Sequence, residues 1–192
     1  MDRLSRKEEK EVVLKCKGGN SSAMSLLYEI YKEELLKSAI RFLKNSEEAE
    51  DVVSEAFVSF FKSIDRFNPN YPVRPWLHKI LRNEATSQLM KRSKTVSLGE
   101  DFVNVEFSEP NSEEEVFNLE EINYVRKALL ELKREDKEIL NYFYFSDLSV
   151  KEISLVLSIP EGTVKSRLFG ARASLSEKIR KLMERKEDER KK

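Results

Sequence analysis

The sequence predicts an all-α protein with two small helical domains joined by a flexible acidic linker. Glycine and proline number only 5 each among 192 residues, so few positions interrupt a helix. Apolar residues recur at helical period along most of the chain. Between residues 93 and 118 this period is lost, and Gly99, Pro110 and an acidic run at 113–115 take its place. We therefore expect domains at 1–95 and 119–185, a linker at 96–118 and a charged tail at 186–192.

Charge divides the chain in the same way. Residues 1–95 carry 18 basic and 14 acidic side chains, a net charge of +4. Residues 96–121 carry nine acidic side chains and no basic one, a net charge of −9. Residues 122–192 carry 17 basic and 12 acidic side chains, a net charge of +5. The zero net charge of the whole chain thus conceals two basic-leaning blocks on either side of an acidic joint.

The composition and the hydropathy pattern exclude several classes of protein. No run of eighteen apolar residues occurs and the first residues are charged, so we expect a cytoplasmic protein without membrane insertion. Cys16 and His78 are the only residues of their kinds, which excludes a disulfide framework and a Cys/His zinc cluster. We expect no catalytic residue, no metal and no cofactor.

Four helices are expected in the first block. The first covers about 6–17 and stops at Gly18-Gly19. The second starts near Ser22, and the third begins at Ser46, which is expected to cap it. The stretch "FNPNYPVRP" at 67–75 breaks the period, because it holds three prolines and two asparagines. A fourth helix follows from about Pro75 to Lys91.

The second block is expected to hold helices at about 119–132, 134–145, 149–157 and 160–185. Ser149 and Glu152 have the spacing of a capping box at the start of one of them. A tight turn at Ser158-Ile159-Pro160 separates the last two helices. Together, residues 147–168 look like a helix-turn-helix, the second helix of which enters the DNA major groove. The alternative is an ordinary helical hairpin with a solvated basic face.

The surface of that second helix favours the DNA-binding interpretation. Val164, Leu168, Ala171 and Leu175 form its apolar stripe, and Phe169 falls outside the stripe. Small groups allow close approach to bases, basic groups suit phosphates, and an aromatic ring can lie against a thymine methyl. The residues expected to contact DNA here are Thr163, Lys165, Ser166, Arg167, Phe169 and Arg172.

A second basic segment lies in the first block. Residues 74–94 hold six Lys and Arg residues and His78 against one acid, Glu84, with Phe67, Tyr71 and Trp76 nearby. Basic residues interleaved with aromatic ones suit single-stranded nucleic acid, and an irregular loop can hold an extruded base. The expected patch is Arg74, Lys79, Arg82 and Asn83. The alternative is that Phe67 and Trp76 belong to the core and the Lys and Arg residues are solvated, and for Trp76 we favour it.

Acidic residues mark a third surface, on the helix that follows Ser46. Glu47, Asp51 and either Ser54 or Glu55 fall on adjacent turns of one face. Paired carboxylates can bind a metal or act as acid and base. No histidine joins them, so a docking face for a protein partner is the favoured interpretation.

Together these stretches resemble the extracytoplasmic-function (ECF) group of bacterial RNA polymerase sigma factors. "AEDVVSEAFVSFFKSIDRFNPN" and "VRPWLHKILRNEATSQLMKRSK" look like sigma region two. "LKREDKEILNYFYFSDLSVKEISLVLSIPEGTVKSRLFGARASL" looks like sigma region four. The resemblance covers all of the chain except the linker and the tail.

The resemblance implies three functional surfaces and their partners. Asp51, Ser54, Glu55 and Phe61 would dock on the core polymerase. Asn68, Asn70 and Tyr71 would surround a flipped base of the minus-ten promoter element, with Arg74, Lys79, Arg82 and Asn83 on the melted non-template strand. The helix-turn-helix residues would read the minus-thirty-five element as duplex. Control by an anti-sigma factor is also expected from the family.

The sequence departs from the family pattern at four positions. Ser54 stands where glutamine is frequent, Phe61 where tryptophan is frequent, and Ser158 where glycine is common in the turn. Gly170 stands where a basic residue is frequent, which removes a phosphate contact. A glycine within a helix also costs about 1 kcal/mol relative to alanine.

Two other classes account for less of the sequence. An ordinary helix-turn-helix regulator needs a ligand or receiver domain upstream, and residues 1–95 show no strand pattern for one. A helical adaptor without a nucleic-acid role leaves both basic patches and Phe169 unexplained. The expected function is therefore that of a sigma factor, which directs the polymerase to promoters and performs no catalysis itself.

Overall fold

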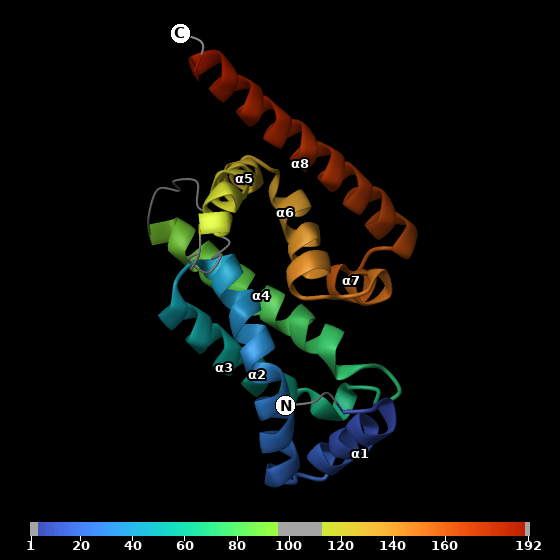
Figure 1. Cartoon of the computed structure of the whole chain (residues 1–192). Coiled ribbons are helices and arrows are strands. Elements are labelled where there is room, and N and C mark those ends of the chain that lie inside the picture. Colours follow the sequence, from blue (N-terminus) through green and yellow to red (C-terminus); the bar gives the residue numbers. More distant parts are fainter. Residues whose placement is uncertain (1–3, 96–112, 191–192) are drawn as a thin grey trace. The chain divides into compact units, whose positions relative to one another are not determined.

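The computed structural model describes residues 4–95 and 113–190, and every regular element in these two ranges is helical (Figure 1). By its internal contacts the chain divides into residues 1–101 with 154–158, and residues 102–153 with 159–192. The predicted all-α class with two helical units is confirmed. The expected linker falls mostly on residues 96–112, which lie outside the described ranges.

The first unit is a helical bundle. Its elements are α1 (Arg6–Lys17), α2 (Ser21–Leu43), α3 (Ser46–Lys62), the short 3-10 helix η1 (Ile64–Arg66) and α4 (Val73–Thr95). Helices α2, α3 and α4 pack against one another, and α1 packs against α2 and η1 (Figure 1). Leu27, Leu35, Phe60 and Leu77 are fully buried between them, and α1 contributes Val13 and Cys16. Burial of these apolar side chains holds the bundle together.

Local hydrogen bonds set where these helices begin and end. Ser5 and Glu8 form a capping box at the start of α1, and Gly19, with a φ of 77°, follows its C-terminal cap. The expectation that Ser46 caps α3 was wrong by one residue. The Asn45 side chain is the cap and accepts from the backbone N–H groups of Glu47 and Glu48. Both residue types are good caps, so the sequence alone did not separate them.

Helix α4 starts two residues before the predicted Pro75 and extends four residues past Lys91. A proline fits this first turn because the N–H groups there have no partner within the helix. The predicted break at 67–75 is correspondingly shorter. It consists of the residues between Arg66 and Val73.

The second unit contains α5 (Glu113–Leu130), α6 (Arg134–Leu140), the π-helical turn η2 (Asn141–Phe145) and α8 (Glu161–Arg190). Helix α7 (Val150–Leu157) begins in this unit, and its residues 154–157 are grouped with the first. Helices α5 and α6 both pack against α8. The buried Lys137 side chain donates to the backbone carbonyl of Leu130 at 2.6 Å, which satisfies an acceptor at the end of α5.

Three boundaries in this unit differ from the expected ones. Helix α5 starts six residues earlier than 119, so the acidic run at 113–115 is helical, and acidic residues are favourable in the first turn of a helix. The expected helix 134–145 changes to a π-helical turn at Asn141. Helix α8 continues to Arg190, so most of the expected tail is helical. Arg180 pairs with Glu177 and Glu184 one turn away on either side, which stabilises the part of α8 just before this extension.

Candidate nucleic-acid interface

The helix-turn-helix expected at 147–168 is present as α7, a short turn and α8. Ser149 and Glu152 form the expected capping box, in which the Ser149 backbone N–H donates to the Glu152 carboxylate at 2.9 Å and the Glu152 N–H donates to the Ser149 hydroxyl at 3.2 Å. Ile153 of α7 and Val164 of α8 are fully buried. The apolar stripes of the two helices thus face inward, and the other side of α8 is left to solvent.

Ser158 in the turn has a φ of 55°, in the left-handed region that favours glycine. This conformation explains why glycine is common at this point of the family pattern. A serine holds the same backbone at a cost of about 1 to 2 kcal/mol, because its Cβ approaches the following carbonyl oxygen.

Five of the expected minus-thirty-five residues form one outward surface, which we call the recognition ridge: Thr163, Lys165, Ser166, Arg167 and Phe169. Thr163 is half-buried, and the other four are exposed. Phe169 is 77% exposed, the largest exposure among the large apolar side chains that the structure describes. Nothing lies within 4 Å of a side chain built at Gly170, so the backbone beside Phe169 is open to a ligand.

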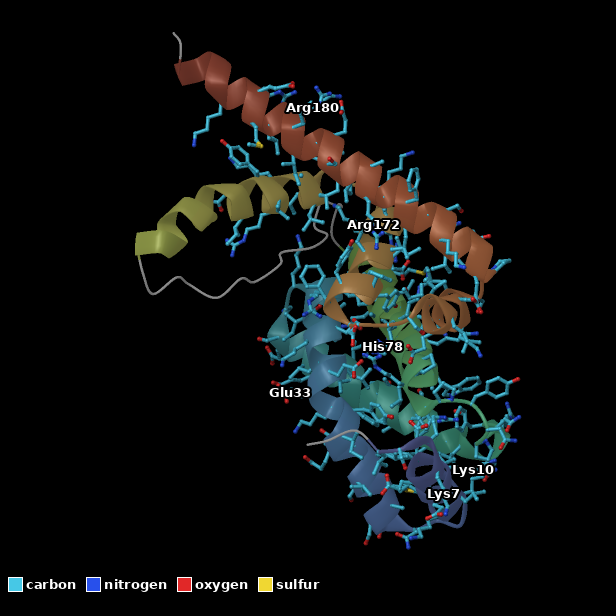
Figure 2. The ribbon with its side chains drawn as sticks, turned by 45° about the vertical axis from the view of Figure 1, so that its right-hand side comes forward. Lys7, Lys10, Glu33, His78, Arg172 and Arg180 are labelled. Carbon is cyan, nitrogen blue, oxygen red and sulfur yellow. The ribbon has the colours of Figure 1, made fainter. Side chains whose placement is uncertain are left out.

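Arg172 differs from the other members of the set. Its guanidinium lies over the rings of Phe143 and Tyr144, with 5.1 and 5.4 Å to the two centroids. Figure 2 shows Arg172 on α8 where that helix passes the π-helical turn. The side chain therefore has aromatic protein partners, which the helical spacing around residue 172 did not indicate.

The loop between η1 and α4 holds the residues expected around a flipped base. The Asn68 side chain accepts from the Asn70 backbone N–H at 3.0 Å, and the Tyr71 N–H donates to the Asn68 carbonyl at 3.0 Å. These bonds make a tight turn that leaves the Tyr71 ring 55% exposed. Beside the turn is a pocket whose lining includes Phe67, Asn68, Tyr71, Trp76 and Lys79.

Phe67 and Trp76 connect this pocket to the core. Phe67 is buried, Trp76 is partly buried, and their ring centroids lie 5.6 Å apart. The interpretation of these two aromatic residues as core is therefore confirmed for Phe67. Trp76 packs against the core and also lines the pocket.

Arg74 does not lie on the expected basic patch. It is 7% exposed, and its Nε donates to Oε1 of Glu34 at 2.7 Å. His78, inside the bundle in Figure 2, places Nε2 2.8 Å from the same oxygen. The sequence carries a signal for this burial. Arg74 and His78 are one turn apart on the helix face that carries the buried Leu77 and Leu81.

Opposing effects act on the Glu34 carboxyl. Burial disfavours its charged form, whereas the hydrogen bonds and charges of His78 and Arg74 favour it. The second effect is larger, so the pKa of Glu34 lies below its ordinary value. The cluster is thus a charged link between α2 and α4, and it holds α4 on the bundle.

The remaining patch residues lie farther along α4. Lys79 and Arg82 are partly exposed, and Asn83 is exposed. Glu84, the acid of this segment, accepts from the Ser59 hydroxyl at 2.9 Å. The acidic charge is therefore directed toward α3.

The acidic face of α3 is also accessible. Asp51, Ser54 and Glu55 are exposed, whereas Phe61 is partly buried against Phe57 and Phe60. Among the described residues, no group of three or more His, Cys, Asp or Glu side chains could hold a metal ion. The described helices also include none that is long and apolar enough to span a bilayer.

Comparison with known proteins places both units in one family. The models for Sigma-70 region 2 and Sigma-70 region 4 match residues 27–95 and 122–175. The ECF RNA polymerase sigma factor SigW of Bacillus subtilis is 29% identical over 191 residues, which cover 95% of this chain and 100% of that protein. These matches lie in the same order as the two units of the structure.

Solved structures agree with this assignment. CnrH in complex with the cytosolic domain of CnrY has a TM-score of 0.65 at 23% identity, over 88% of this chain and 94% of that one. The sigma factor RpoE in complex with the anti-sigma factor NepR, from Bartonella quintana, has a TM-score of 0.61 at 25% identity, over 80% and 96%. With both sigma regions present, and with ECF relatives along its length, the chain belongs to the ECF group of the sigma-70 family of RNA polymerase sigma factors.

Proposed function

We propose that this chain binds bacterial RNA polymerase core and directs it to promoters, where it helps to open the DNA. The observation that carries the proposal is the presence of sigma regions two and four, in that order, in one chain. An ordinary helix-turn-helix regulator needs only the second of them. The family is one of transcription initiation factors, so the polymerase performs the chemistry, and this chain acts in the cytoplasm without catalysis or cofactor.

The first domain, residues 1–95, docks on the polymerase and reads the minus-ten element. Exposure of the carboxylates of Asp51 and Glu55 supports the docking role, because they can pair with basic groups of a partner. Ser54 and Phe61 flank them. Since Phe61 is partly buried, only part of its side chain is available to the polymerase.

The minus-ten surface combines the Asn68–Tyr71 turn with the outward side of α4. The pocket beside the turn has aromatic walls, as stacking of an extruded base requires. Lys79, Arg82 and Asn83 then follow the melted non-template strand. Arg74 is left out of this set, because it is buried against Glu34.

The second domain, residues 119–185, reads the minus-thirty-five element through the recognition ridge. Lys165 and Arg167 are exposed on α8 beside the bare Phe169 ring. This arrangement suits phosphates on the groove walls and a thymine methyl between them. Arg172 contributes by holding α8 against the π-helical turn.

An anti-sigma factor is the expected regulator. RpoE, the structural relative at 25% identity, was solved in complex with one. Such a partner would keep this chain from the polymerase until a signal releases it. Full constitutive activity in the native cell, with no inhibitor bound to the protein, would contradict this part of the proposal.

Run-off transcription tests the main proposal. Core polymerase is supplied with or without this chain on a library of promoter fragments, and new start sites are mapped. We expect defined start sites that disappear with Asp51→Arg, and also with Lys165→Ala combined with Arg167→Ala. Lys151→Ala, an exposed lysine on α7 outside the ridge, is the matched control. Duplex binding without any polymerase-dependent start site would assign the chain to the ordinary regulators.

A further inference from the structure

Helix α1 lies outside the region-two match, which begins at residue 27. It nevertheless contacts the segment 65–73, which contains the loop between η1 and α4, at three points. We call this segment the minus-ten loop. Lys17 Nζ donates to the backbone carbonyl of Asp65 at 2.9 Å. Lys10 Nζ donates to Oδ1 of Asn70 at 2.9 Å. Oε1 of Glu9 accepts from the backbone N–H of Val73 at 3.4 Å. The contacts thus fall at the start, the middle and the end of the segment 65–73.

Glu9 provides the buried contact of the three. It is 5% exposed, and its Oε1 also accepts from the Tyr31 hydroxyl of α2 at 2.5 Å, while Oε2 pairs with Arg6. Val73 is the first residue of α4, where backbone N–H groups have no partner within the helix. A carboxylate at this end is favourable for the helix dipole. Glu9 therefore acts on α4 as a cap supplied from another helix, fixed in place through Tyr31.

Lys10 determines which way the Asn70 amide faces. An ammonium group can only donate, so the atom next to it must be the amide oxygen. The NH₂ group of Asn70 then points away from α1 and offers donors only. The backbone of Asn70 is fixed too, since its N–H donates to the Asn68 side chain.

We propose that α1 is a positioning helix for minus-ten recognition, and that Lys10 makes Asn70 present its NH₂ group, a hydrogen-bond donor, to the base beside it. The inference rests on the proposed function, because it assumes that the loop meets promoter DNA. Glu9 and Lys17 fix the two ends of the loop, and Lys10 sets the amide between them. None of the three needs to touch DNA, so they are positioning residues.

The test uses the full chain bound to core polymerase. The wild-type holoenzyme first selects a single-stranded minus-ten oligonucleotide from a randomised pool. Binding of the selected oligonucleotide, and of its single-base variants, is then measured by fluorescence anisotropy. Lys10→Ala combined with Lys17→Ala should weaken binding by about 3- to 10-fold, as expected for the loss of two exposed hydrogen bonds. Binding to core polymerase should not change.

Lys7→Ala is the matched control. Lys7 is an exposed lysine on the same helix and takes part in none of the three contacts (Figure 2). The Lys7→Ala variant should bind the oligonucleotide as the wild type does. An equal loss with Lys7→Ala would mean that α1 acts through its general positive charge, which would overturn the positioning role.

Lys10→Glu is the sharper variant. A carboxylate can only accept, so it would turn the Asn70 amide and present its oxygen outward. The order of preference among the four bases should then change at the one position that lies beside Asn70. In an Asn70→Ala background the same substitution should leave the preference unchanged. If Lys10→Glu alters preference equally in both backgrounds, Lys10 does not act through Asn70 and the inference fails.

Two kinds of failure can be told apart. If the wild-type holoenzyme selects no minus-ten sequence, the proposed function is wrong. If it does select one, and the lysine variants bind and discriminate as the wild type does, the proposed function stands and the role of α1 is wrong.

Glu9→Gln keeps a hydrogen-bond acceptor for Tyr31 and Val73. The Glu9→Gln variant should therefore bind the selected oligonucleotide more tightly than the Glu9→Ala variant.

Discussion

Arg74 and Glu34 form a buried ion pair between α4 and α2, with 2.7 Å between Nε and Oε1. His78 meets the same carboxylate oxygen at 2.8 Å from the next turn of α4. This one oxygen atom therefore links two turns of α4 to the interior of the bundle. Helix α4 also carries several of the expected minus-ten residues. The pairing gives Arg74 a structural role in place of the DNA contact that its sequence context indicated.

Arg74→Ala should lower the free energy of unfolding of the first unit by about 2 to 4 kcal/mol, because it removes the guanidinium that pairs with the partly buried Glu34 carboxylate. Denaturant unfolding followed by circular dichroism measures the change. Lys7→Ala, which removes an exposed cation from the same unit, should change it by less than about 0.5 kcal/mol. Unchanged stability together with lost oligonucleotide binding would restore Arg74 to the DNA surface.

The lowered pKa of Glu34 predicts an acid-sensitive bundle. A carboxyl group whose pKa is lower in the folded than in the unfolded state stabilises the fold fully above its ordinary value of 4.5. That contribution is lost as the pH falls from 4.5 through the lower folded-state pKa. Thermal unfolding between pH 7 and pH 3 should therefore show a smaller decrease in Tm for Glu34→Gln than for the wild type. Parallel curves for the two proteins would show that another group causes the acid sensitivity.

Ser158→Gly should stabilise the unit that contains the turn between α7 and α8. Its backbone has a φ of 55°, and glycine removes the strain at a smaller cost in chain entropy. We expect a gain of about 0.5 to 1 kcal/mol, or a rise in Tm of about 2 to 8 °C for a unit of this size. Ser176→Gly, within the regular helix α8, should have the opposite sign. A loss of stability with both substitutions would contradict the strained turn.

Phe169→Ala should separate base reading from phosphate binding. The ring is 77% exposed, so its loss should leave stability unchanged but weaken binding to a selected minus-thirty-five duplex by about tenfold. The slope of log affinity against log salt should stay the same. Lys165→Ala should instead make that negative slope shallower, by about 1. Titrations of both variants at several salt concentrations measure these effects. A changed slope for Phe169→Ala would mean that the ring acts indirectly, through the neighbouring cations.

Local patterns account for the part of the structure that the sequence could predict. Helical spacing gave the main helices, and the Ser149–Glu152 spacing gave the cap of α7, because each depends on residues within one or two turns. The outward position of Phe169 followed from the apolar stripe on the opposite side of α8. These features form without any information from distant parts of the chain.

Contacts between distant residues account for what the sequence did not reveal. Arg74 pairs with a residue 40 positions away, and Lys10 with one 60 positions away, so neither contact leaves a periodic pattern. The guanidinium of Arg172 is occupied by rings of a π-helical turn, an element that is too rare to expect from spacing. The sequence predicted the kinds of surface, and tertiary packing decided which basic side chains are exposed.

Because Cys16 is buried, the rate at which it is chemically labelled reports how often α1 opens from the bundle. The thiol, the only one in the sequence, is 1% exposed on the inner side of α1, and burial raises its pKa. A thiol reagent can therefore react with it only when α1 opens from the bundle. The labelling rate of the unmodified protein should follow that opening. Lys10→Ala with Lys17→Ala should accelerate labelling, and bound minus-ten oligonucleotide should slow it.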